Sequence, residues 1–121
     1  MQSDYALLRT GLAAFLASAT QRILSELPPD MSGSLRAQHL GIFLAVVSLT
    51  ELDEVATAAT ISSFVKLAKT HVGTALKVLV EIGVLDRKKV PPMQGRGFMY
   101  VYTPSADLSK LREIRERDIA G

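Results

Sequence analysis

The sequence has no cysteine and no tryptophan, and its aromatic residues are three tyrosines and four phenylalanines in a chain of 121 residues. Without cysteine, the chain cannot form disulfides or bind a metal ion through thiolates. Its longest apolar run, residues 41–47, is much shorter than the roughly 20 residues that span a bilayer. These absences are compatible with a reducing compartment, and we expect a cytoplasmic protein with no membrane partner.

Patterns typical of catalysis are missing as well. The chain has only two histidines, no Ser-His-Asp spacing, no glycine-rich phosphate loop and no paired carboxylates in a cleft-like context. We therefore expect a protein that is not an enzyme and that uses no metal or cofactor. With 48% hydrophobic and 21% charged residues, the composition is that of a globular chain, and residues 1–121 are expected to form a single domain.

Acidic residues are absent from one long stretch, since none occurs between Glu54 and Glu81. The formal net charge of +2 is unevenly distributed along the chain. Residues 1–60 contain three basic and six acidic residues, whereas residues 61–121 contain eleven basic and six acidic ones. This distribution favours a polyanionic partner for the C-terminal half.

Residues 70–88 have the pattern of an amphipathic helix followed by a basic cluster. On an ideal helix the apolar residues fall on one face, which comprises Val72, Ala75, Leu76, Leu79 and Ile82. The small or polar residues fall roughly opposite, and they are Thr70, Gly73, Thr74 and Lys77. Gly83 is a typical C-terminal stop. A helix that enters a DNA major groove needs such a small, uncharged-to-cationic face; the alternative is an ordinary amphipathic helix with a solvated face.

The neighbouring segments extend this pattern to a winged helix-turn-helix. Thr57 is a suitable N-cap for a short helix over residues 58–65, and residues 66–69 form the turn. Residues 85–90 and 98–103 are rich in β-prone side chains and are predicted as two strands. The intervening proline- and glycine-rich link places Arg96 at a hairpin tip, where an arginine suits the negative potential of a minor groove. A solvated loop arginine is the alternative.

Helices are expected on both sides of this unit. Residues 4–27 carry apolar side chains on two sides, as in a helix that is buried by its own core and by a second subunit; a central helix of a monomer is the alternative. Residues 35–49 are predicted as a second helix with Ser34 as its N-cap, followed by an acidic linker over residues 51–54. A last helix is expected over residues 106–119.

We thus assign residues 4–50 and 105–119 to dimerisation and residues 57–103 to DNA binding. His39, in the second helix, is interpreted as a satisfied core or interface histidine, because no second metal ligand lies at helical spacing from it.

The order of these parts resembles that of the MarR-type transcriptional regulators. The family's helix-turn-helix ends in a leucine, three residues, a glycine and two apolar residues, and the matching residues are Leu79, Gly83, Val84 and Leu85. Its wing carries an aspartate, one residue, an arginine and a later threonine; Arg96 and Thr103 keep this spacing, while Gln94 replaces the aspartate. ArsR-type winged helices are the nearest rival and suit the chain length, but their cysteine-bearing metal motif is absent here.

The resemblance implies a mainly α fold with a small β-hairpin wing and a homodimer that binds a palindromic operator. It also implies a small aromatic or phenolic ligand that releases the DNA. We therefore predict a sequence-specific transcriptional regulator, located in the cytoplasm and on the nucleoid; the alternative is a winged-helix module that binds protein and not DNA.

The predicted DNA-binding residues fall into three groups. Sequence reading is assigned to Thr70, His71, Thr74 and Lys77 at base edges. Phosphate binding is assigned to Lys69, Lys77, Arg87 and Lys88, with Lys66 and Lys89 as further candidates, so Lys77 is a candidate for both kinds of contact; Arg96 is assigned to the minor groove. Gly73 is expected to allow a close approach of the backbone to DNA, or else to pack against the preceding helix.

Overall fold

The computed structural model describes residues 2–92, 95 and 97–105, with the backbone alone for residues 2–12. The elements run in the order α1 (Gln2–Glu26), α2 (Gly33–Glu51), α3 (Ala58–Val65), α4 (Lys69–Ile82), β1 (Leu85–Val90) and β2 (Met99–Pro104). The two strands form an antiparallel hairpin. The predicted fold class, mainly helical with a small hairpin, is therefore confirmed, and the arrangement is winged helix-like. Arg96 and the helix predicted over residues 106–119 lie outside the described residues.

The predicted boundaries hold best where a capping residue is unambiguous. Helix α3 has the predicted bounds, because the Thr57 and Thr60 side chains cap each other's backbone N–H groups in a capping box. Gly83 ends α4 as predicted, with a left-handed φ of +93°. The prediction of Ser34 as the N-cap of α2 was wrong: the Ser32 side chain caps this helix by accepting a hydrogen bond from the Leu35 N–H at 3.2 Å. Both serines are chemically able to cap, so composition alone did not decide between them.

Other boundaries also differ from the prediction; helix α1, predicted over residues 4–27, runs Gln2–Glu26. Helix α2 continues to Glu51, so the predicted acidic linker begins inside the last turn of that helix. Strand β2 starts at Met99, one residue later than expected, because the last pair of the ladder is Val90 with Met99. Phe98 therefore lies just beyond the ladder, on the side of the hairpin tip.

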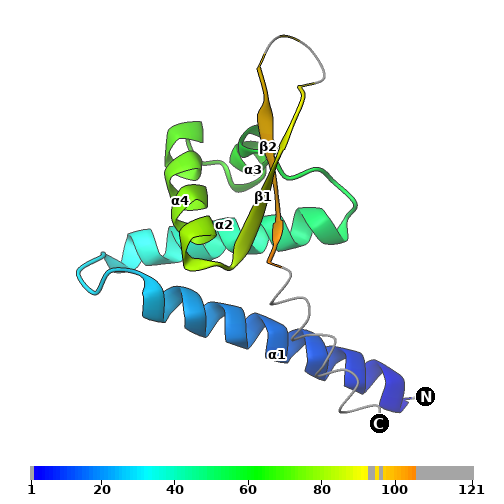
Figure 1. Cartoon of the computed structure of the whole chain (residues 1–121). Helices are drawn as coiled ribbons and strands as arrows, with labels where there is room; N and C mark the ends of the chain where they lie inside the picture. The colour runs from blue at the N-terminus through cyan, green and yellow to red at the C-terminus, as the bar shows by residue number, and fades with distance from the viewer. Residues whose placement is uncertain (1, 93–94, 96, 106–121) are drawn as a thin grey trace.

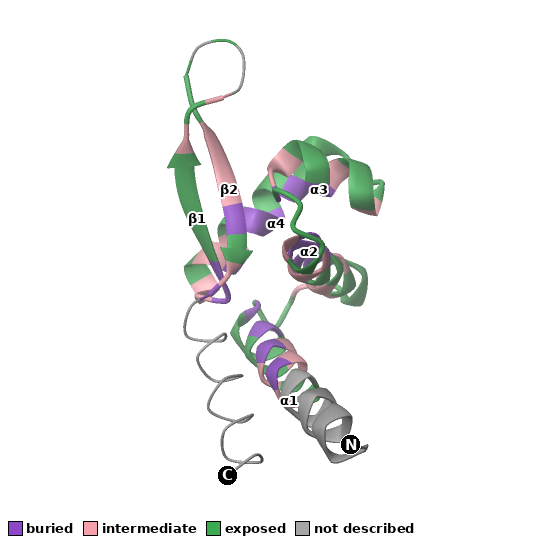
Figure 2. Ribbon diagram, turned by 90° about the vertical axis from the view of Figure 1, so that its right-hand side faces the viewer, coloured by how far each residue is buried: buried purple, intermediate pink, exposed green. Residues whose placement is uncertain are grey.

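One hydrophobic core unites the described elements. Helix α2 crosses the middle of the molecule, with α1 on one side of it and the helix-turn-helix and hairpin on the other (Figure 1). The buried residues lie on the sides of the helices that face one another (Figure 2). Helix α1 contributes Phe15, Ala19 and Ile23 to this core. This packing fixes the rotation of α4 about its own axis and so decides which of its side chains are exposed.

Within the described part of the chain, no helix combines the length and the hydropathy that a membrane crossing requires.

Candidate nucleic-acid interface

The outer face of α4 is exposed as the sequence predicts. Val72, Ala75, Leu76 and Leu79 are buried, and the predicted DNA-facing residues are all exposed, namely Lys69, Thr70, His71, Gly73, Thr74 and Lys77. The Thr74 hydroxyl donates to the Thr70 carbonyl at 3.0 Å, which leaves its oxygen lone pairs available to a donor on a partner. From Lys69 to Lys77 the face offers short polar side chains and two lysines but no carboxylate; Glu81, exposed one turn further on, is the first acidic residue on this side of the helix.

Gly73 lies in the middle of this face, and its two predicted roles can now be separated. A Cβ added at Gly73 would meet no atom within 4 Å. The alternative of a packing contact with the preceding helix is therefore wrong. What the glycine leaves is an uncovered patch of backbone on the outer side of α4, which suits a close approach by another molecule.

The start of α4 differs from the start of α3. Its N-cap is Ala68, which makes no side-chain capping bond, and its first turn contains no acidic residue. The positive end of the helix dipole is thus not neutralised by a side chain, and Lys69 adds a full charge beside it. This combination is favourable for a phosphate group.

The hairpin carries its cations on two opposite faces. Arg87 pairs with Tyr102, Lys88 with Val101 and Lys89 with Tyr100. Because side chains alternate along a strand, Arg87 and Lys89 lie on one face and Lys88 lies on the other. The three residues therefore cannot all contact the same DNA strand from one face of the hairpin, although they are consecutive in the sequence.

The face with Arg87 and Lys89 is organised by aromatic rings. The Arg87 guanidinium carbon lies 4.4 Å from the centre of the Tyr100 ring, and Lys89 Nζ lies 3.7 Å from the centre of the Phe98 ring. Phe98 and Tyr100 meet edge to face, with ring centres 5.4 Å apart. These contacts hold the cations in a defined geometry while Phe98 stays 52% exposed. The spacing of residues 98, 100 and 102 at every second position could have revealed this aromatic row.

Tyr102 ties the hairpin to the helix-turn-helix. It is buried, and its backbone N–H donates to the Ala56 carbonyl, just before α3, at 2.8 Å. Burial raises the pKa of the Tyr102 phenol above its ordinary value, whereas the nearby Arg87 lowers it through its charge and a hydrogen bond. The hairpin base is thereby held in a defined position beside α3 and α4.

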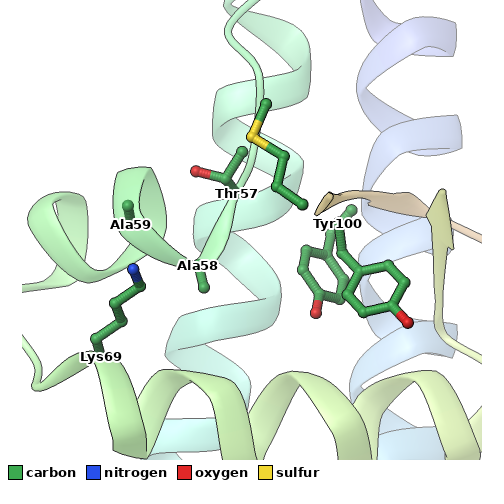
Figure 3. A pocket seen from close by; sticks show the side chains of 7 residues that line it. Thr57, Ala58, Ala59, Lys69 and Tyr100 are labelled. Carbon is green, nitrogen blue, oxygen red and sulfur yellow. The ribbon is translucent and has the colours of Figure 1, made fainter. Parts of the chain in front are cut away.

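A groove of about 250 Å³ joins the two predicted contact surfaces. It lies between the start of α3, the start of α4 and strand β2 (Figure 3), and it is lined by Thr57, Ala58, Ala59, Lys69, Met99, Tyr100 and Tyr102. The Lys69 side chain extends from α4 towards the start of α3 (Figure 3). Sequence reasoning found Lys69 but missed Thr57 and Tyr100 as site residues, because three separate elements bring them together.

The hairpin tip is described only in part. Gly95 and Gly97 both have a φ of +92°, a left-handed conformation that favours glycine, as expected for a tight tip. Arg96 stands between them in the sequence, outside the described residues.

Elsewhere, His39 is buried, as expected, but it is only half satisfied. Its Nδ1 lies 2.7 Å from the Leu35 carbonyl oxygen, whereas its Nε2 is buried without a hydrogen-bond partner. In the part of the chain that the structure covers, no group of three or more histidine, aspartate or glutamate residues is placed to hold a metal ion.

Comparison with models of known protein families gives no match, and comparison with curated proteins finds no relative. The fold and the geometry of this surface are therefore what indicates a function.

Proposed function

We propose that this protein is a DNA-binding transcriptional regulator that places α4 in the major groove of a duplex. The observation that carries the proposal is the outer face of α4, which is exposed, free of carboxylates from Lys69 to Lys77 and anchored by a buried apolar face. Base edges would be read by Thr70, His71 and Thr74, which are short or planar polar side chains able to donate and accept hydrogen bonds. An ordinary solvated helix face has no need of such a concentration of small residues.

The phosphate backbone would lie along the groove between α4 and the hairpin. Lys69 lines this groove, and Arg87 and Lys89 lie on the aromatic face of the same hairpin. A DNA strand that runs from the major groove beside α4 towards the hairpin tip would thus contact these cations with its phosphates. At the tip, Arg96 would enter the minor groove. Lys88, on the opposite face of the hairpin, would bind a different phosphate.

The proposal includes a homodimer. Helix α1 is 25 residues long, and its described side chains from residue 13 onwards already bury Phe15, Ala19 and Ile23 against the chain's own core. The same helix exposes Leu24, and its sequence carries a second apolar arc for a partner subunit. Two copies of α4 would then lie about 34 Å apart and read a palindromic operator. The resemblance to MarR-type regulators adds a small-molecule effector to the proposal.

Selection of bound fragments from the genome of origin tests the proposal most directly. We expect the wild-type chain to enrich fragments that share an inverted repeat. On such a site, Lys77→Ala should weaken binding several-fold at fixed salt and lower the salt dependence by about one counterion. Arg22→Ala, a charge-matched change on α1, should leave the affinity unchanged.

Two outcomes would contradict DNA binding. One is equal effects of the Lys77 and Arg22 substitutions. The other is the absence of any gel retardation at low salt by a chain that still dimerises, which would favour the winged-helix protein-interaction module in its place.

A further inference from the structure

One face of the hairpin leads from the core to an exposed aromatic ring. Arg87 and Lys89 pair with Tyr102 and Tyr100 across the ladder, so these four side chains share a face. Phe98 continues the two-residue spacing and packs edge to face with Tyr100, with ring centres 5.4 Å apart. Along this row Tyr102 is buried, Tyr100 is partly buried and Phe98 is exposed. The face that packs on the helical body at its base therefore presents an exposed ring near the hairpin tip.

Exposure alone does not identify a partner for this ring. Phe64, on α3, is 50% exposed and Phe98 is 52% exposed, and single exposed apolar side chains are normal on a protein surface. Phe98 is distinguished by the cations beside it, because Lys89 Nζ lies 3.7 Å from its ring centre and Arg87 lies over the neighbouring Tyr100 ring. The paired residues on this face of the ladder include no carboxylate. An apolar protein surface would bury the ammonium group at a high cost, whereas nucleic acid offers flat bases together with phosphates.

The contact between Lys89 and Phe98 can be exchanged for contacts with DNA. Both side chains are exposed, and an exposed ammonium group binds an aromatic ring only weakly. A phosphate oxygen is a stronger partner for it, because the hydrogen bond between them is charge-assisted. The lysine side chain has a flexible four-carbon stem and can therefore turn from the ring to a phosphate. The ring surface that the ammonium covered is then free to contact a base.

We propose that Phe98 is a wedge that enters the minor groove and separates two stacked base pairs, while Lys89 binds an adjacent phosphate. This inference rests on the proposed function, in which the hairpin tip reaches the minor groove. Apolar side chains that enter this groove partly unstack a base step and kink the duplex by about 20–90°. Pyrimidine–purine steps such as TA and CA unstack most easily. The ligand is therefore a duplex with such a step beneath each hairpin, and binding bends it there.

Unstacking can be measured with 2-aminopurine, an adenine analogue whose fluorescence rises when it leaves the base stack. It is placed at successive positions of the operator obtained by fragment selection, and the full chain is added at saturating concentration. We expect the wild-type chain to raise the fluorescence several-fold at one step in each half-site. Phe98→Ala should abolish this rise and lower the affinity by about fivefold or more, because base–aromatic contacts are lost. Phe64→Ala, which removes an equally exposed ring from α3, should leave both values unchanged.

Two further measurements sharpen the test. Energy transfer between dyes at the ends of the operator should show a bend with the wild-type chain and a smaller one with Phe98→Ala. Replacing the flexible step by AA, which is stiffer, should weaken wild-type binding several-fold and leave the affinity of Phe98→Ala unchanged.

The outcomes separate the wedge from DNA binding itself. If the wild-type chain retards the operator in a gel but raises fluorescence at no position, the wedge is wrong and the proposed function stands. Equal fluorescence with the wild-type and Phe98→Ala chains, whose circular dichroism melting curves should coincide, would also overturn the role of Phe98. A chain that retards no duplex at low salt would contradict both proposals.

Discussion

Helix α4 and the β1–β2 hairpin were both predicted to contact DNA, but the sequence described the first far better than the second. On α4 the helical periodicity alone determines which side chains are buried, because residues three and four positions apart share a face. On the hairpin each side chain is placed by its own strand and by its cross-strand partner. The comparison shows that charge along a strand predicts less about an interface than charge along a helix.

The largest expected effect separates the two faces of α4. Leu76 is completely buried, so Leu76→Ala should destabilise the fold by about 2–5 kcal/mol. Lys77→Ala, one position later on the exposed face, should change the free energy of unfolding by no more than about 0.5 kcal/mol. Chemical denaturation followed by circular dichroism measures both values. Similar losses in the two variants would mean that the rotation of α4 is not the one described.

An intermediate effect separates the two faces of the hairpin. Arg87→Ala removes the stack on Tyr100 and the hydrogen bond to Tyr102, and it should cost about 1 kcal/mol of stability. Lys88→Ala removes an exposed side chain of the opposite face, so we expect almost no change. The same denaturation experiment applies. If Lys88→Ala proved the more damaging, the assignment of the aromatic contacts to the Arg87 face would be wrong.

The sequence predicted the parts of the molecule that depend on local patterns. The bounds of α3 follow from the Thr57 cap, and the end of α4 follows from Gly83. The choice of Ser32 over Ser34 was not predictable, because two chemically equivalent caps lie two residues apart. Local pattern therefore fixes an element when one residue is clearly suited to end it.

The contacts that sequence could not supply all join separate elements. The groove brings Thr57, Lys69 and Tyr100 together from α3, α4 and β2. A cavity of about 180 Å³ between α2 and α4 is lined by both His39 and His71. Neither set of positions has a spacing typical of one helix or one strand, because its residues become neighbours only through the packing of separate elements. Candidate residues on a single amphipathic helix were accessible to sequence reasoning, and constellations across elements were not.

The smallest expected effect tests how tightly the hairpin is joined to the helical body, in contrast with the freely exposed face of α4. The pKa of Tyr102 is raised above 10.0, chiefly by burial, so the folded chain holds the phenolic proton more strongly than the unfolded chain does. Between these two pKa values the unfolded state binds fewer protons than the folded state, and stability must therefore fall as the pH rises through and beyond about 10. Below that range both states are protonated and Tyr102 contributes no pH dependence.

Tyr102→Phe should flatten this part of the stability profile, measured by denaturation between pH 8 and pH 11, while the wild-type and Tyr100→Phe chains keep the steeper decline. An unchanged slope in Tyr102→Phe would show that burial does not raise the pKa of this phenol, and the buried position of Tyr102 at the base of the hairpin would then be wrong.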